Sequence, residues 1–267
     1  MLSLSRALLS VVGSALETCD DWVMEPPRTA RERARIEVAS EIRDVARRQL
    51  AEHGADGLSL RAVSREMGMV SSALYRYYPS RDDLLTALII DAYNAVGAAA
   101  ERAAAARSGA DPASRWMAVG RAVRAWALAH PHEYALVYGS PVPGYRAPPD
   151  TVDPAVRVTR VLGGLLIDAT APEGPVPAVP AKLRRDLDRV RSVSGPGVPD
   201  VVVVRGLMAW TQLVGAISLE LFGHFHDTVD ETSALFDHML EIMGAFVGFG
   251  SLPASGRSRR IRSGGAK

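Results

Sequence analysis

Apolar residues recur every three or four positions along most of the chain, which is the period of amphipathic helices. In the first third of the chain, Gly54 is placed to end one helix and Pro79 to end another. Ser80 is placed to cap a long helix, with Asp82 and Asp83 in its first turn near the positive end of the dipole. The pattern therefore predicts helices over residues 31–53, 60–67, 71–78 and 80–107.

The same period continues to residue 249, broken by two proline-rich stretches at 141–154 and 172–180 that read as loops. The best strand candidate, residues 201–204, leads directly into a longer helical pattern. Further helices are predicted over 112–130, 132–139, 154–170, 180–193, 200–225 and 231–249. The fold class is all-α.

The two short helices at 60–67 and 71–78 are joined by a Gly-containing turn and preceded by a longer helix, which predicts a helix-turn-helix. The second short helix would enter the major groove of DNA, with Ser71, Ser72, Tyr75 and Arg76 on its outer face. Arg61 and Arg81 begin the flanking helices and would reach phosphates. Spacing alone leaves a helical hairpin of an unrelated bundle as the alternative.

Charge is distributed unevenly, although the chain as a whole carries only +1. Residues 28–81 contain eleven arginines and seven acidic residues, a net charge of +4, whereas residues 82–256 carry a net charge of −5. A basic segment beside a larger acidic part favours one face for a polyanion and a body with another task.

Residues 31–85, and above all LSLRAVSREMGMVSSALYRYYPSRDDLL, resemble the N-terminal domain of TetR-type transcriptional regulators. The resemblance differs at Val70, where the family often has Ser, and at Tyr78, where Phe is usual. It implies a double-stranded DNA partner with a roughly palindromic operator. The implied DNA-facing residues are Ser59, Arg61, Ser71, Ser72, Tyr75, Arg76, Tyr77 and Arg81.

The stretch 124–148 resembles, more loosely, the C-terminal regulatory domains of a subset of that family. That resemblance implies a homodimer formed through the last two helices and a small organic effector, of unidentified structure, bound inside the bundle. The expected effector residues are Trp116, Trp126, Tyr134, Tyr138, Met208 and Trp210, for which plain core packing is the alternative. The expected dimer residues, at the 3-4 spacing of a helix seam, are Leu207, Val214, Ile217, Leu221, Leu235, Met239, Ile242 and Phe246.

Other functional classes find little support in the sequence. The single cysteine, Cys19, excludes a multi-cysteine zinc site, and no nucleophile-elbow, phosphate-loop or zinc-protease motif occurs. We therefore expect no enzyme, no metal and no cofactor. No uninterrupted apolar run is long enough to span a bilayer, so we expect no membrane partner and a cytoplasmic location.

The expected organisation has four parts: an N-terminal extension at 1–27, a DNA-binding domain at 28–81, an effector-binding and dimerisation domain at 82–250, and a basic tail at 251–267. Translation beginning at Met24 is a hypothesis for the extension. The leading function is a homodimeric repressor released from its operator by an effector. The alternatives are a small-molecule sensor or sequestering protein that has lost DNA binding, and an architectural DNA-binding protein without an effector.

Overall fold

The computed structural model describes residues 29–171, 177–195 and 197–250. Every regular element in those ranges is helical, which confirms the all-α prediction. The extension at 1–27, including Met24, and the tail at 251–267 lie outside the described residues. The α-helices are α2 (Ala30–His53), α3 (Leu60–Glu66), α4 (Ser71–Leu74), α5 (Arg81–Ala105), α6 (Pro112–Ala129), α7 (Pro131–Tyr138), α8 (Val152–Leu165), α9 (Arg184–Ser194), α10 (Asp200–Leu221) and α11 (Thr232–Val247).

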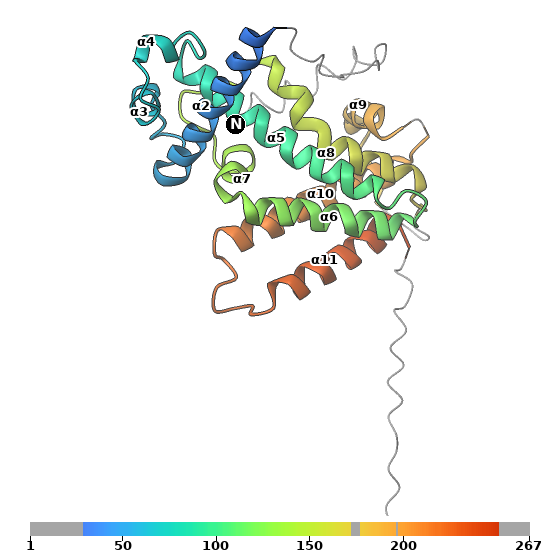
Figure 1. The fold of residues 1–267 in the computed structure, drawn as a ribbon. Coiled ribbons are helices and arrows are strands. Elements are labelled where there is room, and N and C mark those ends of the chain that lie inside the picture. Colours follow the sequence, from blue (N-terminus) through green and yellow to red (C-terminus); the bar gives the residue numbers. More distant parts are fainter. Residues whose placement is uncertain (1–28, 172–176, 196, 251–267) are drawn as a thin grey trace, which may run out of the picture.

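Helices α2, α3 and α4 form a small unit that packs on the first half of α5 (Figure 1). A capping box at Thr29 and Glu32 starts α2, and Gly54, with a φ of 69°, ends it. The core of this unit consists of buried aliphatic side chains with Tyr78 at its edge. Its fully buried members are Ile42, Ala46, Val63, Leu74, Leu84 and Leu85.

Helix α5 connects this unit to the rest of the protein. Ser80 caps it by accepting a hydrogen bond from the Asp83 backbone amide, as the sequence predicts. Its N-terminal half contributes to the small core, and its C-terminal half contributes Ala92, Val96 and Ala100 to a second, larger core. One continuous helix therefore belongs to both cores.

The larger core is enclosed by α5, α6, α8, α9, α10 and α11. Helix α6 lies between α5 and α11, and α10 and α11 pack side by side as the last two helices (Figure 1). Close approach requires glycine at the α6–α11 contact, because a Cβ at Gly120 would lie 2.7 Å from the Leu240 side chain.

Helix α7 contacts both cores. Leu136, Val137 and Tyr138 pack against the small core, while Val137 and Tyr138 also pack against the large one. The Tyr93 hydroxyl on α5 donates a hydrogen bond of 3.1 Å to the Val137 carbonyl. Just beyond α7, the hydroxyls of Tyr145 and Thr86 lie 2.9 Å apart. Segment 131–145 therefore ties the two parts of the protein together.

Several predicted boundaries need correction, since α10 ends at Leu221 rather than at residue 225 and α8 ends at Leu165 rather than at residue 170. Helix α4 ends at Leu74 rather than at residue 78, and turns carry the chain to Pro79. The proline-rich loop at 141–154 contains a 3-10 turn, Pro149–Thr151, and the first turn of α8.

Helices α5 and α10 are long and apolar enough to meet a length-and-composition test for membrane spans, a feature that the search for uninterrupted apolar runs missed. Both helices contribute buried residues to the cores described above, so their apolar character has a role in packing.

Candidate nucleic-acid interface and regulatory core

Helices α3 and α4 form the predicted helix-turn-helix. Val63 and Leu74 are wholly buried between them, and Gly68, with a φ of 66°, makes the turn. The hydroxyls of Ser64 on α3 and Ser71 on α4 lie 3.1 Å apart, which joins the two helices directly. The relative orientation of α3 and α4 is therefore fixed by both apolar and polar contacts.

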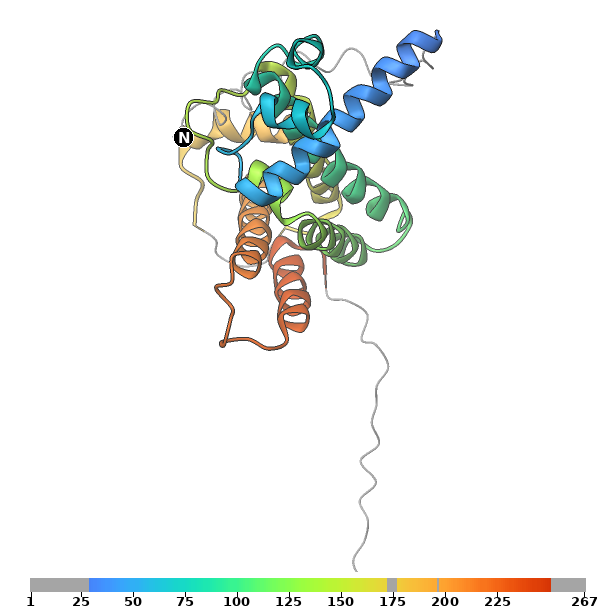
Figure 2. The ribbon, with the colours of Figure 1, turned by 60° about the vertical axis from the view of Figure 1, so that its left-hand side comes forward.

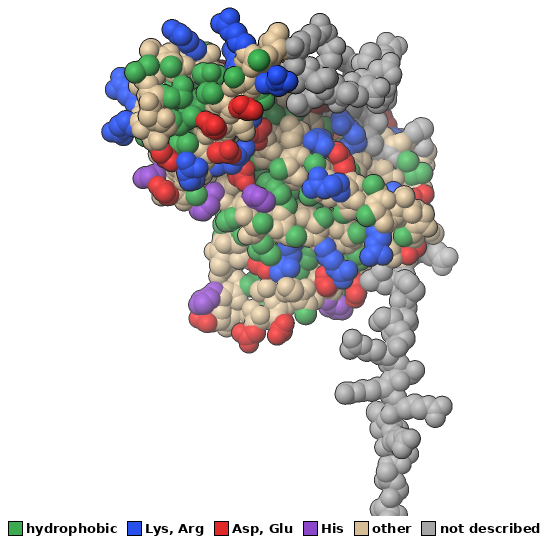
Figure 3. All heavy atoms as spheres, in the orientation of Figure 1, with side chains coloured by type: hydrophobic (Ala, Val, Ile, Leu, Met, Phe, Trp, Pro, Cys, Tyr) green, Lys and Arg blue, Asp and Glu red, His purple; other side chains and the backbone are tan. Residues whose placement is uncertain are grey.

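The outer face of this motif carries polar side chains with free hydrogen-bonding groups. Ser72, Tyr75 and Arg76 on and just after α4 are exposed, as is Arg61 on α3. No carboxylate among the described residues pairs with Arg61 or Arg76. Figure 3 shows arginine side chains along the rim formed by this part of the molecule, which contains no lysine. The surface is suited to a polyanion.

Several predicted DNA-facing residues have other or additional roles. The Arg81 guanidinium is directed into the protein, donating 3.2 Å and 2.6 Å hydrogen bonds to the Leu58 and Ala55 carbonyls, so it fixes the loop before α3 and is not free to reach a phosphate. Ser59 precedes α3 as its N-cap residue, but its hydroxyl makes no capping hydrogen bond. Tyr77 is half-buried beneath the Arg35 guanidinium.

Two exposed residues at the motif were missed. Arg65 lies one turn after Arg61 on the same face of α3, and no partner among the described residues engages it. Val70 precedes α4 and is 71% exposed, although it is apolar. The signal for Arg65 was its i, i+4 spacing from Arg61, whereas nothing in the spacing separates Val70 from the buried positions.

An ion-pair network joins this unit to α5 and α7. Asp91 on α5 pairs with Arg43 at 2.8 Å and with Arg47 at 3.0 Å, both from α2. The Arg47 Nε atom also lies 3.3 Å from an oxygen of Glu133 on α7. Arg43 further donates a 3.0 Å hydrogen bond to the Tyr78 hydroxyl beside the helix-turn-helix. The orientation of α2 thus depends on both α5 and α7.

The expected effector residues fall into separate places. Tyr134 and Tyr138 on α7 and Trp210 on α10 form an aromatic cluster with Tyr93, with ring centroids 5.1–6.0 Å apart. Trp126 stacks on His130 at 5.5 Å. Met208 is 51% exposed on the outer face of α10, so it is not part of an internal wall.

Two tyrosine hydroxyls in that cluster differ sharply. The Tyr134 hydroxyl donates a 3.0 Å hydrogen bond to the Val214 carbonyl and lies 2.8 Å from the Ser218 hydroxyl. The Tyr138 hydroxyl is buried and finds no partner among the described residues. Burial raises the pKa of Tyr138 well above its ordinary value, because the phenolate would be poorly solvated there.

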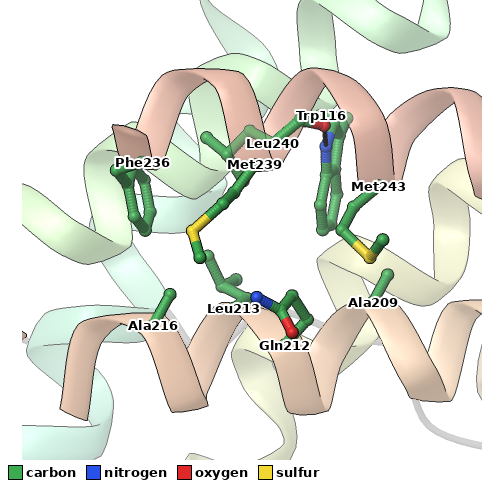
Figure 4. A pocket seen from close by; sticks show the side chains of 9 residues that line it. All are labelled: Trp116, Ala209, Gln212, Leu213, Ala216, Phe236, Met239, Leu240 and Met243. Atoms are coloured by element: carbon green, nitrogen blue, oxygen red, sulfur yellow. Dashed lines mark hydrogen bonds between the residues drawn. The ribbon is translucent and has the colours of Figure 1, made fainter. Parts of the chain in front are cut away.

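Trp116 lies apart from the aromatic cluster, where it lines a cleft between α10 and α11. Its indole nitrogen donates a 2.8 Å hydrogen bond to the Leu240 carbonyl. Met239 and Met243 extend from α11 toward α10 across the cleft (Figure 4). The cleft holds about 190 Å³ of empty space, part of it open to solvent, which is less than the 300 Å³ or more of a typical ligand pocket.

The predicted dimer residues divide between the interior and the surface. Ile217 is wholly buried in the protomer, so it belongs to the core and not to an interface. Leu207 and Ile242 are exposed, at 41% and 51%. The others are partly buried, and these are Val214, Leu221, Leu235, Met239 and Phe246.

A second set of exposed apolar residues on α10 was not predicted as an interface. Met208, Leu219 and Phe222 are each 43–51% exposed, and their spacing places them along one side of the helix with Gly215, beside which there is open space. The 3-4 repeat in the sequence identifies two seams on α10, but it does not show which one packs inside the protomer.

Comparisons with known proteins agree with this arrangement. A sequence model described as bacterial regulatory proteins of the tetR family matches residues 42–88, and one described as a tetracyclin repressor-like C-terminal domain matches residues 116–243. The HTH-type transcriptional regulators Rv1816 of Mycobacterium tuberculosis and Mb1846 of Mycobacterium bovis are each 41% identical over 225 residues, which is 80% of this chain and 94% of theirs.

Solved structures show the same similarity. The putative regulatory protein SCO4313 is 39% identical, with a TM-score of 0.68 over 80% of this chain and 98% of its own. A protein from Rhodococcus sp. RHA1 is 23% identical, with a TM-score of 0.56 over 79% of this chain and 93% of its own, and it supports the fold alone.

Proposed function

The chain belongs to the TetR family of transcriptional regulators, and on that premise we propose that it is a homodimeric repressor that leaves its operator when a small organic effector binds. The observation that carries the DNA-binding part is the outer face of α3, α4 and the turn after α4, where Arg61, Tyr75 and Arg76 are exposed and have no side-chain partner among the described residues. A protein that had lost DNA binding would have no need of these cations.

Dimerisation is supported by the exposed apolar side of α10. Met208, Leu219 and Phe222 share that side, and Ile242 is exposed on the neighbouring α11. Apolar side chains on adjacent helices are suited to a symmetric contact, in which each copy presents the same surface. We call residues 71–78, which contain α4, the recognition segment. The recognition segments of two protomers, related by the same twofold axis, would then enter successive major grooves of a roughly palindromic site.

Effector control is supported by the position of α7. The buried Tyr138 hydroxyl has no partner among the described residues, and Glu133 on the same helix pairs with Arg47 of α2. A ligand that satisfies this hydroxyl would favour a shifted α7, and the shift would reach α2 through the ion pairs. Couplings of this kind are typically about 1–3 kcal/mol, or about 5- to 150-fold in affinity.

The test is a binding titration of the purified chain with duplex DNA from upstream of its own gene, at fixed salt and with unrelated DNA as competitor. We expect tight binding that resists the competitor. Binding no tighter than to the competitor, at that site and in a genome-wide selection, would refute the DNA-binding function. A screen for compounds that release the bound duplex then tests effector control, and sedimentation of the free protein tests the dimer.

In the proposed function the protein works on DNA in the cytoplasm, without a cofactor and without catalysis. Family membership supports this, since regulators of transcription act by binding. Among the described residues, no group of three or more His, Cys, Asp or Glu side chains is placed to hold a metal ion.

A further inference from the structure

The first turns of α2 project beyond the small unit as an arm. Every residue from 29 to 37 is exposed, and the first buried residue of the helix is Ile42. Residues 30–37 extend the helix by about 12 Å at 1.5 Å per residue. Figure 2 shows this end of α2 standing clear of the body. We call residues 30–37 the α2 arm.

The α2 arm is stabilised as a helix by local contacts, although it buries nothing. The Thr29 side chain accepts a hydrogen bond of 3.1 Å from the Glu32 amide, and the Glu32 carboxylate accepts one of 2.9 Å from the Thr29 amide. Both orphan amides are thereby satisfied, and the negative charge of Glu32 lies at the positive end of the helix dipole. The arm therefore holds its other side chains at fixed positions around a helix.

Three of those side chains are arginines without an acidic partner among the described residues: Arg31, Arg33 and Arg35. At 3.6 residues per turn, Arg31 and Arg35 share one side of the helix and Arg33 lies on the opposite side. The Arg35 guanidinium lies 5.9 Å from the Tyr77 ring centroid. The side of the arm that carries Arg31 and Arg35 therefore faces Tyr77, just after α4.

We propose that the α2 arm is a second DNA contact, in which Arg31 and Arg35 bind backbone phosphates of the duplex just outside the groove entered by α4. This inference rests on the DNA-binding function proposed above. The arm lies outside residues 42–88, the part that matches the family's N-terminal model. Its length corresponds to about three to four base pairs at 3.4 Å each, so the contact falls in the flank of the site.

Phosphates are the expected target because, in the proposed arrangement, α4 occupies the groove and the arm lies beside it, where its guanidinium groups meet the DNA backbone. Guanidinium groups bind phosphate oxygens strongly and release counterions when they do so. Each neutralised phosphate lowers the slope of log affinity against log salt by about 0.9. Arg31 and Arg35 on both protomers of a dimer would contribute about 3 to 4 to that slope.

The experiment uses a duplex of about 30 base pairs, enriched from a random pool with the full chain, and the same duplex shortened by about four base pairs at each end. Affinity is measured by fluorescence anisotropy as a function of salt for the wild type, the double variant Arg31→Ala/Arg35→Ala, and the single variant Arg33→Ala. Alanine keeps the helix intact, and Arg33 is the matched control on the opposite side of the same arm.

On the long duplex, we expect the double variant to bind about tenfold or more weakly at low salt. Its slope of log affinity against log salt should be less negative than that of the wild type by about 3 to 4. Arg33→Ala should bind like the wild type, and Arg31→Lys/Arg35→Lys should keep the wild-type slope. On the shortened duplex, the double variant and the wild type should bind alike.

If the double variant and the wild type have equal affinity and equal slope on the long duplex, the proposed DNA contact of the arm is refuted and the proposed function still stands. A loss of equal size on both duplexes would also refute that contact, because it would then lie inside the core site. If the full chain enriches no duplex from the pool, the proposed function fails and the arm fails with it.

Discussion

Two tyrosines of α7, the buried Tyr134 and the partly buried Tyr138, offer a direct test of the aromatic cluster, because one buried hydroxyl has partners and the other has none among the described residues. Tyr134→Phe removes the hydrogen bond to the Val214 carbonyl and leaves the Ser218 hydroxyl without its 2.8 Å neighbour. The loss of a satisfied buried hydroxyl costs about 1–2 kcal/mol of unfolding free energy. Tyr138→Phe removes a buried hydroxyl that has no described partner, and it should be neutral or stabilising by about 1 kcal/mol.

The two variants should therefore differ by about 1–3 kcal/mol, although each loses one oxygen atom from the same cluster. For a domain of about 150–250 residues, 1 kcal/mol corresponds to a shift in Tm of about 2–4 °C, so Tyr138→Phe should unfold about 2–12 °C above Tyr134→Phe. Thermal unfolding followed by circular dichroism measures the gap, at one fixed protein concentration because association shifts Tm.

The reasoning is refuted if Tyr138→Phe is destabilised as much as Tyr134→Phe, since the Tyr138 hydroxyl would then have a partner. The same pair informs on the effector. A compound that accepts a hydrogen bond from Tyr138 should raise the Tm of the wild type more than that of Tyr138→Phe. A compound that raises both equally binds elsewhere.

Four further predictions concern the other sites. Arg76→Ala and Tyr75→Ala should each weaken operator binding about tenfold or more in anisotropy titrations, while the Tm stays at the wild-type value. Unchanged affinity in both variants would exclude the outer face of α4 as the DNA contact. Phe222→Asp should give monomers by light scattering, more completely than Leu207→Asp, because Phe222 lies on the exposed apolar side of α10; a dimer that persists in both would place the interface elsewhere. Glu220→Gln should lower the free energy of unfolding by about 1–3 kcal/mol in urea titrations, because it breaks a 2.7 Å charged hydrogen bond from Arg124. That bond lowers the pKa of Glu220, so the stability of the wild type should fall as pH drops below the ordinary carboxyl range. Burial raises the pKa of Tyr93, Tyr134, Tyr138 and Tyr145, so the stability that these tyrosines contribute should be complete below about pH 10 and be lost above it, as the unfolded tyrosines ionise first. An absorbance titration in which all tyrosines of the folded protein ionise at their ordinary pKa would contradict this.

The sequence predicted the helices well because their ends carry strong local signals. The cap at Ser80 and the glycine after α2 each act through neighbouring residues, and so they can be read without tertiary structure, whereas Pro79 did not mark the end of α4, which stops at Leu74. The helix-turn-helix was equally accessible, since its apolar positions follow one short repeat.

The site residues that were misplaced depend on contacts distant in sequence. Arg81 is at the start of a helix beside residues predicted to face DNA, yet its partners are the carbonyls of Ala55 and Leu58, more than 20 positions earlier. On α10, Ile217 and Met208 are both apolar at helical spacing, but one is in the core and the other on the surface. Periodicity identifies the apolar sides of a helix, and only packing decides which side faces inward.

The bridging position of segment 131–145 limits how this regulator can be recombined. An exchange of domains among related regulators would naturally cut the chain near the start of α5 and join the small unit of α2 to α4 from another protein there. In this protein, such a cut would leave Leu136, Val137 and Glu133 facing a surface for which they were not selected. A working chimera should therefore carry α2 to α5 together with segment 131–145 from the same parent, so that these parts are inherited in two separate pieces of sequence.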